Sequence, residues 1–315
     1  MKKEMNFTAR LLSLSLLPLT LVAALVLAAD RDLLLAPAPL TAAVAAMPGA
    51  ELAPKLVSTL PPPATGARAF ISAYLSPRGQ LTVLATQDAN LRWPIASITK
   101  LFTAAVASQE DNLNQIVTLA AEDLPENSDS GFFHVGESFR LGDLFLPLLL
   151  ESSNNAATVL ANHSQVDFIQ SLNNLANKLA LHDTRFFNPH GLDSQIGVNY
   201  SSAYDLTLFA KWLLQNKSEL LAFTRLPAAI LAQANGEFHH QINSTNELLL
   251  SAPWAGEIIG GKTGSTDLAG KNLLLILRAP NQAGYLISVV LGSSDHFTAT
   301  RELIDWTLAS YQFAS

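Results

Sequence analysis

Cysteine is absent from the 315 residues of this chain, and charged residues are scarce at 14%. The lack of thiols excludes a disulfide framework, a thiolate zinc site and a cysteine nucleophile. The net charge is −7 and the sequence has no strongly basic run, so nucleic acid is not expected as a partner. Hydrophobic residues make up 49% of the chain, which suffices for one large domain or two modest lobes.

An uncharged apolar run from Leu11 to Ala29 follows Lys2, Lys3 and Arg10. As a helix it would span about 28 Å, close to the ~30 Å of bilayer hydrocarbon. Basic residues before the run predict that the N-terminus stays inside and the rest lies outside the cytoplasmic membrane. Two interpretations stay open for residues 1–32: a retained signal anchor over 11–29, or a cleaved signal peptide that releases a secreted protein.

Residues 33–66 are rich in alanine and proline, with Pro61-Pro62-Pro63 near the end. Proline removes hydrogen-bond donors and favours extended backbone, so this segment is expected to be a tether. A catalytic domain is expected over residues 67–315.

Apolar periodicity predicts alternating strands and helices within that domain. Strands are expected at Ala69–Leu75, Gln80–Ala85, Glu257–Thr263, Asn272–Arg278 and Tyr285–Leu291. Helices are expected from Ser97, over Leu141–Leu150, from Ala156, after capping patterns at Ser164–Asp167 and Ser202–Asp205, and over Arg301–Tyr311. Strands at both ends with helices between them predict a mixed α/β fold.

Three short motifs occur in order: Ser97-Ile98-Thr99-Lys100, Ser152-Ser153-Asn154 and Lys262-Thr263-Gly264. Each is weak alone, but together they resemble the active site of penicillin-binding proteins and serine β-lactamases. The likeness is closest to low-molecular-mass D-alanyl-D-alanine carboxypeptidases and endopeptidases, and His190-Gly191-Leu192-Asp193 adds to it as scaffold. The resemblance implies an antiparallel sheet flanked by helices plus a helical lobe, with the active site between them.

Ser97 is the expected nucleophile, since it opens a helix whose free backbone N–H groups favour developing negative charge. Lys100, three residues on, lies on the same helix face and can act as the base if it is neutral. Ser152 can relay a proton to the leaving amine. Asn154 offers an amide to bind substrate backbone and orient Lys100.

Lys262 and Thr263 come at a predicted strand end, which suits binding of an extended peptide and its terminal carboxylate. Gly264 leaves room for close backbone approach. The resemblance further implies that the backbone N–H groups of Ser97 and Ser265 form the oxyanion hole. It implies a DD-peptidase that acts on peptidoglycan stem peptides and is inhibited by β-lactams.

Two other functions stay open. A class A β-lactamase uses a glutamate between the second and third motifs, yet none occurs between Glu151 and Glu219. A non-catalytic penicillin- or wall-binding module would be indicated by a broken motif, but every catalytic side chain is present. Carboxypeptidases of the family often carry a C-terminal β domain that is not visible here, so carboxypeptidase and endopeptidase are both retained.

A metal or cofactor is not expected. His239 and His240 are the one adjacent histidine pair, and neighbours on a strand point to opposite faces. The sequence spaces no carboxylate partner to help them hold a metal. His190 is expected to be structural.

Overall fold

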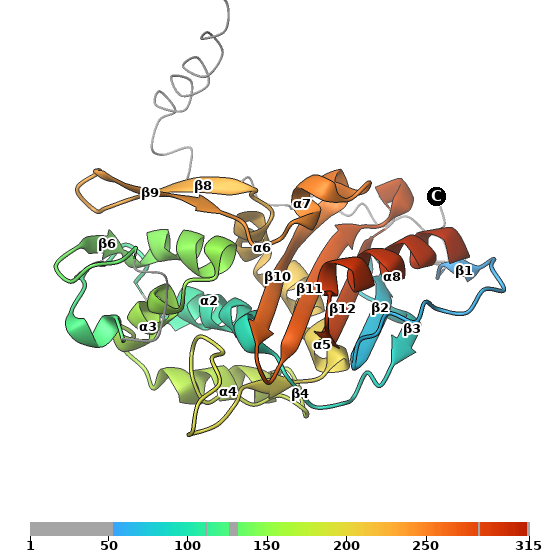
Figure 1. Ribbon diagram of the computed structural model, residues 1–315, viewed down its shortest axis with the longest axis horizontal. Coiled ribbons are helices and arrows are strands. Elements are labelled where there is room, and N and C mark those ends of the chain that lie inside the picture. Colours follow the sequence, from blue (N-terminus) through green and yellow to red (C-terminus); the bar gives the residue numbers. More distant parts are fainter. Residues whose placement is uncertain (1–52, 111, 126–131, 283, 314–315) are drawn as a thin grey trace, which may run out of the picture. The chain divides into compact units, whose positions relative to one another are not determined.

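The computed structural model describes residues 53–110, 112–125, 132–282 and 284–313 (Figure 1). The apolar run at residues 11–29 and most of the tether therefore lie outside the described residues. In the described ranges no helix is both long and apolar enough to cross a membrane.

Strands lie at both ends of the described chain, and most of the helices lie between them. The strands are β1 (Lys55–Leu56), β2 (Ala69–Leu75), β3 (Leu81–Gln87), β4 (Trp93–Pro94), β5 (Ile116–Thr118), β6 (Ser138–Arg140), β7 (Tyr200–Ser201), β8 (Ala228–Ala232), β9 (Phe238–Asn243), β10 (Ile258–Thr266), β11 (Gly270–Arg278), β12 (Tyr285–Ser293) and β13 (Tyr311–Gln312). The α-helices are α2 (Thr99–Glu110), α3 (Asn154–Asn162), α4 (Phe168–Lys178), α5 (Ala203–Asn216), α6 (Ser218–Thr224), α7 (Leu248–Ser251) and α8 (His296–Ser310). The remaining short turns are the 3₁₀ helices η2 (Ala96–Ile98), η3 (Ala121–Asp123), η4 (Leu141–Leu144), η6 (Ala255–Glu257) and η7 (Pro280–Gln282), and the π-helix η5 (Pro147–Glu151).

A five-stranded antiparallel sheet in the order β10-β11-β12-β2-β3 forms the centre of the fold. Strand β12 is apolar on both faces because helices cover both. Its residues Ile287 and Val289 share a core with Phe209 of α5. Its residue Val290 packs instead with Leu303 of α8. Since side chains alternate along a strand, α5 and α8 lie on opposite faces of the sheet, which confirms the expected mixed α/β architecture.

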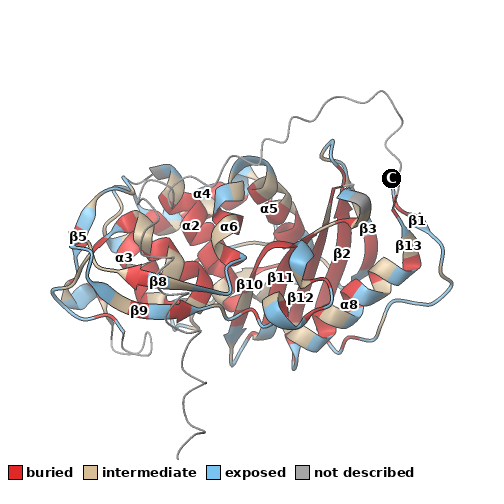
Figure 2. Cartoon of the chain, turned by 90° about the horizontal axis from the view of Figure 1, so that it is seen from above, coloured by how far each residue is buried: buried red, intermediate tan, exposed pale blue. Residues whose placement is uncertain are grey.

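Helix α2 is the buried axis of the helical lobe, which also contains α3, α4 and η5 (Figures 1 and 2). Leu101 and Phe102 are 0% exposed, and Phe102 stacks on Phe209 with ring centroids 3.5 Å apart. A helix that is apolar all round is stable only when it is enclosed. This enclosure fixes the N-terminal end of α2, where Ser97 and Lys100 lie.

Part of the expected tether lies against the domain. Strand β1 pairs antiparallel with β13, with Lys55 opposite Gln312. The indole N–H of Trp306 donates to the carbonyl of Leu60 at 3.2 Å, and Thr65 is buried. Residues 55–65 therefore follow the surface of α8 and β13, although residue 67 was expected to begin the domain.

Strand β2 begins and ends at the predicted residues, whereas several helix boundaries differ. The segment Leu141–Leu150 is not one regular helix: it passes from 3₁₀ turn to π-helix, with Pro147 at the start of the π-helix. Helix α3 begins at Asn154 and not at Ala156, because the Ser153 side chain caps it by accepting from the backbone N–H of Ala156.

Caps also explain two other differences. Asp167 alone caps α4, by accepting from the N–H of Gln170, so the predicted Ser164–Asp167 box does not form. Helix α8 begins at His296, earlier than the predicted Arg301, because Asp295 caps it. Ser202 caps α5 as predicted.

Candidate active site

Ser97 lies in the 3₁₀ turn η2, directly before α2, and is half-buried. The preceding residue Ala96 has a φ of +47°, a conformation that costs energy for a residue with a Cβ. Gly191 packs against this turn, and a Cβ at Gly191 would lie 2.0 Å from the carbonyl oxygen of Ala96. The glycine of the His-Gly-Leu-Asp motif thus lets one loop support the strained turn that presents Ser97.

Lys100 is 0% exposed, and its ammonium nitrogen has three oxygen partners. The distances from Nζ are 2.8 Å to Ser97 Oγ, 2.6 Å to Asn154 Oδ1 and 3.0 Å to the carbonyl oxygen of His190. The last two oxygens can only accept hydrogen bonds. A neutral Lys100 would therefore donate to both of them and turn its lone pair toward the Ser97 hydroxyl, as a general base requires.

Ser152 and Asn154 lie where the π-helix η5 ends and α3 begins. Ser152 has a φ of +68°, in the left-handed region, and its backbone N–H donates to the carbonyl of Pro147. The left-handed residue turns the chain so that Asn154, two residues on, reaches Lys100. The first and second motifs are thus joined by a direct hydrogen bond.

Lys262 is 1% exposed on β10, and its Nζ donates to the carbonyl of Thr263 at 3.1 Å. Burial, reinforced by the charge of Lys100, holds the pKa of Lys262 well below its ordinary value. Gly264 lies against the turn of Ser97, since a Cβ there would be 3.1 Å from the backbone nitrogen of Ser97. Ser265 is exposed on the same outer strand of the sheet. The third motif therefore borders the first.

Comparison with known proteins agrees with this arrangement. A family profile described as D-alanyl-D-alanine carboxypeptidase matches residues 72–295. The chain belongs to this family. Its sequence is 31% identical over 260 residues to the D-alanyl-D-alanine carboxypeptidase DacB2 of Mycobacterium tuberculosis, covering 80% of this chain and 85% of that protein. It is 29% identical to a D-alanyl-D-alanine endopeptidase of Pseudomonas aeruginosa, covering 79% of this chain and 82% of that protein.

Solved structures of related proteins have the same fold as this member of the D-alanyl-D-alanine carboxypeptidase family. A D-alanyl-D-alanine carboxypeptidase from Mycobacterium tuberculosis superposes with a TM-score of 0.71 and 27% identity, covering 83% of this chain and 99% of that one. A penicillin-binding protein from Listeria monocytogenes in its cefotaxime-bound form superposes with a TM-score of 0.67 and 28% identity, covering 79% and 99% of the two chains. The predicted antiparallel sheet with a helical lobe is confirmed.

His190 contributes more to the peptidase site than a scaffold role suggests. Its carbonyl oxygen is one of the three partners of Lys100, and its Nδ1 accepts from the backbone N–H of Leu192 at 3.1 Å. Burial, with the nearby charge of Lys100, lowers the pKa of His190 to about 4. The imidazole is therefore neutral at physiological pH, with its proton on Nε2. A backbone contact of this kind leaves no sequence signal beyond the motif itself.

Asp193 and Thr245 join the walls of the site and were not singled out as functional. Asp193 accepts from the hydroxyl of Thr266 at 3.0 Å and from the N–H of Leu268 at 3.2 Å, which fixes the turn after β10. The hydroxyls of Thr245 and Thr263 lie 2.7 Å apart. A lone threonine in a loop carries no pattern that could have indicated this contact.

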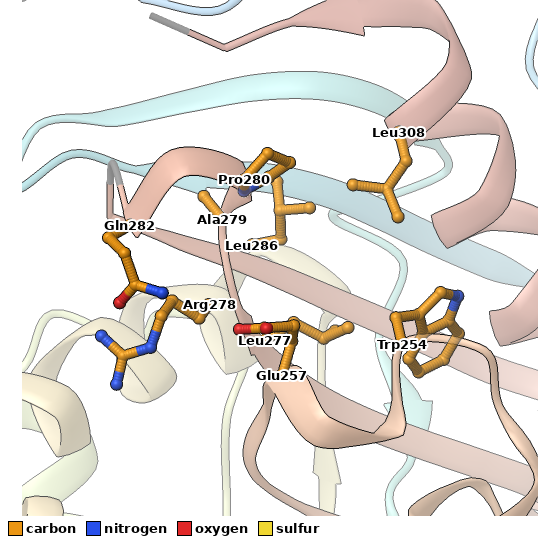
Figure 3. Close-up of a pocket in the computed structure, with 9 residues that line it drawn as sticks. All are labelled: Trp254, Glu257, Leu277, Arg278, Ala279, Pro280, Gln282, Leu286 and Leu308. Carbon is orange, nitrogen blue, oxygen red and sulfur yellow. The ribbon is translucent and has the colours of Figure 1, made fainter. Parts of the chain in front are cut away.

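A pocket of about 150 Å³ opens at the opposite end of β10 and β11 from the three motifs (Figure 3). Its walls include Trp254, Glu257, Arg278 and Leu308, and none of the motif residues lines it. This hollow is therefore separate from the contact between Ser97 and Lys100.

The expectation that His239 and His240 diverge is wrong. Their Nδ1 atoms lie 2.6 Å apart, and carboxylates of Glu137 and Glu151 contact their outer nitrogens. The cause is a bulge: Ala232 pairs with Phe238 and Leu231 with His240, so His239 is the extra residue. Across residues 53–313 as described, no group of three or more metal-binding side chains is arranged to hold a metal ion.

Proposed function

We propose that this serine-type DD-peptidase cleaves D-Ala-containing peptide bonds of peptidoglycan stem peptides through an acyl-enzyme on Ser97. The observation that carries the assignment is the contact of Lys100 with Ser97, Asn154 and the His190 carbonyl. It supplies a nucleophile, a base in hydrogen-bond contact with that nucleophile, and two acceptors that orient the base. The chain's family establishes the reaction class, and the cefotaxime-bound relative supports β-lactams as inhibitors.

The reaction follows from these contacts. Neutral Lys100 takes the Ser97 proton while Oγ bonds to the carbonyl carbon of the substrate. The backbone N–H groups of Ser97 and Ser265 receive the oxyanion, and each such donor typically contributes ~3 kcal/mol. Ser152 relays the proton taken up by Lys100 to the leaving amine as the C–N bond breaks. Water then hydrolyses the Ser97 ester and restores the hydroxyl.

The substrate would lie along β10. As an outer strand of the sheet, β10 can pair with an extended peptide through its backbone. Lys262 and Thr263 on this strand would bind the substrate carboxylate, while Gly264 allows the strand to lie close to Ser97. This geometry suits a β-lactam as well, because its carboxylate and amide mimic the D-Ala-D-Ala terminus.

A fluorescent penicillin tests the assignment. It should acylate Ser97 of the full chain, and Ser97→Ala should abolish labelling while the melting temperature stays nearly unchanged. Labelling that persists in Ser97→Ala, or an adduct mapped to Ser152, would contradict it. Mass analysis of muropeptides then separates the two activities: loss of terminal D-Ala indicates a carboxypeptidase, and loss of crosslinked dimers an endopeptidase.

We further propose that the enzyme faces the cell wall from the outer side of the cytoplasmic membrane, held by residues 11–29. The apolar run, the basic residues before it and the proline-rich segment after it support this location. In the native protein, activity should stay with membranes after a high-salt wash, because apolar insertion is not screened by salt. A soluble protein beginning at Ala29 or Asp30 would reject the anchor in favour of secretion.

A further inference from the structure

Four titratable side chains outside the Lys100 contacts form an unbroken chain, which we name the histidine brace. Its members are Glu137, His239, His240 and Glu151. His239 Nε2 lies 3.1 Å from Glu137 Oε2, the two Nδ1 atoms lie 2.6 Å apart, and His240 Nε2 lies 3.0 Å from Glu151 Oε2. The four side chains are largely buried, with exposures between 6% and 18%. Buried contacts of this kind are favourable only when one of the two atoms in each contact carries a proton.

The proton count of the brace follows from its geometry. Three hydrogen bonds in a row need three protons, whichever atom of each pair is the donor. Two carboxylates and two neutral imidazoles bring only two. The brace therefore holds one extra proton, and its net charge is −1. The central bond forms when one of the two Nδ1 atoms carries a proton and the other accepts it.

Aromatic rings enclose the two histidines. Phe132 stacks on His240 with centroids 4.4 Å apart, while Phe133 and Phe139 contact His239 at 5.4 Å and 5.2 Å. These rings carry no charge, so they exclude water without competing for the shared proton.

Other charged groups lie on the described elements packed against the brace. The loop before β6 carries Glu137 and His134, whose Nδ1 lies 3.6 Å from the Glu137 carboxylate, and η5 carries Glu151. Arg140 on β6 and Glu237 before β9 are exposed, and β8 has no charged residue.

The brace ends beside the second motif. Glu151 is the last residue of η5 and is bonded to Ser152, whose left-handed backbone must be held in place. The same hairpin, β8–β9, leads to Thr245, whose backbone N–H donates to the carbonyl of Leu150 at 3.0 Å. In Figure 1 the hairpin lies over the helical lobe next to β6. The hairpin therefore holds η5 through two contacts, one with the side chain of Glu151 and one with the backbone carbonyl of Leu150.

We propose that the histidine brace positions Ser152 for proton delivery to the leaving amine. His239 and His240 are positioning residues, since they act through Glu151 and touch no reacting atom. The inference rests on the proposed function of Ser152. It predicts that acylation slows when a bond of the brace is removed, and that a substitution which keeps the bond to Glu151 restores most of the rate.

Three variants of the full chain test the brace. His240→Phe keeps a ring beside Phe132 but breaks both bonds of that residue, and should slow acylation by a fluorescent penicillin by ~10-fold or more. His240→Gln keeps a donor to Glu151, so it should recover most of the rate. His182→Gln, on an exposed histidine, is the matched control and should behave as the wild type.

A second measurement does not depend on activity. NMR of the ¹⁵N-histidine-labelled chain should show one proton shared between the two Nδ1 atoms, absent in His239→Phe. Folded His240→Phe and His239→Phe variants that acylate at the wild-type rate would overturn the proposal, as would the absence of the shared proton. A wild-type chain that is not acylated at all would instead reject the proposed function, which separates the two failures.

Discussion

Lys262 lies buried beside Lys100, and the charge of one disfavours the charge of the other. Burial and the Lys100 ammonium together hold the pKa of Lys262 well below its ordinary value, and the two side chains are 1% and 0% exposed. Because both amines are buried, a state in which both carry a positive charge is unfavourable. Such a site favours a state in which one amine is neutral, or one in which a substrate carboxylate supplies the opposite charge.

Replacement of Lys100 by arginine should abolish most acylation. The guanidinium keeps the positive charge but does not lose a proton in proteins, so it cannot accept the Ser97 proton. We expect the second-order rate of penicillin acylation to fall by at least ~10²-fold, the typical contribution of a general base. Lys178→Arg, an exposed lysine on α4, is the control. A near-normal rate in Lys100→Arg would remove Lys100 from the role of base.

The carboxylate contact of Lys262 can be tested on both partners. Amidation of the substrate's terminal carboxylate should weaken kcat/KM of the wild type far more than that of Lys262→Ala, because the variant has already lost the contact. A double cycle over the two changes measures their coupling. Additive losses would show that Lys262 does not bind the carboxylate.

Gly191→Ala should destabilise the fold and slow acylation together. The new Cβ meets the carbonyl oxygen of Ala96 at 2.0 Å and sits at a φ of +90°. Gly136→Ala is the matched control, since its φ of +93° is equally unfavourable but its Cβ meets nothing within 4 Å. The control should lose only the ~1–2 kcal/mol of the left-handed backbone. Urea unfolding and penicillin labelling check both; equal losses in the two variants would contradict the close packing.

Stability should fall as the pH is lowered, in part because of His296. This histidine is 8% exposed, neither ring nitrogen has a hydrogen-bond partner within the described part of the chain, and burial and Lys271 lower its pKa to about 4. Between about pH 6.5 and pH 4 the unfolded chain binds this proton and the folded chain does not, so the free energy of unfolding decreases by up to about 3 kcal/mol.

His296→Leu should therefore flatten this dependence, measured by urea unfolding at pH 7 and pH 4.5. The leucine has no proton to bind, so the variant should lose less stability on acidification than the wild type. His182→Gln, at an exposed histidine, should keep the wild-type slope. An unchanged slope in His296→Leu would show that this residue does not carry the effect.

The sequence predicted the elements whose secondary structure depends mainly on their own residues. Strand β2 begins and ends at its predicted residues, and all three C-terminal strands of the sheet were expected, because continuous apolar runs between turn residues have few alternatives. Ser97, Lys100 and Asn154 were named from motif spacing, and the structure joins them by hydrogen bonds. For Ser152, Thr263 and Ser265 the fold gives a position, and their chemical roles stay predictions.

Other features depend on partners distant in the sequence. The π-helical end of Leu141–Leu150 was missed because periodicity does not distinguish it from a regular helix. Convergence of His239 and His240 depends on a bulge in β9, which follows from pairing with β8 and has no local signature. Glu137 and Glu151 reach these histidines from 102 and 89 residues away. Spacing rules cannot detect a contact of that kind.

The pairing of β1 with β13 decides where tension on the N-terminal segment would enter the domain. If residues 11–29 anchor the chain as proposed, a pull on that segment would load the Lys55–Gln312 pair and the Trp306–Leu60 contact, at the end of α8, before it reached β2. The load would thus meet the α8 side of the sheet before the strand beside Ser97.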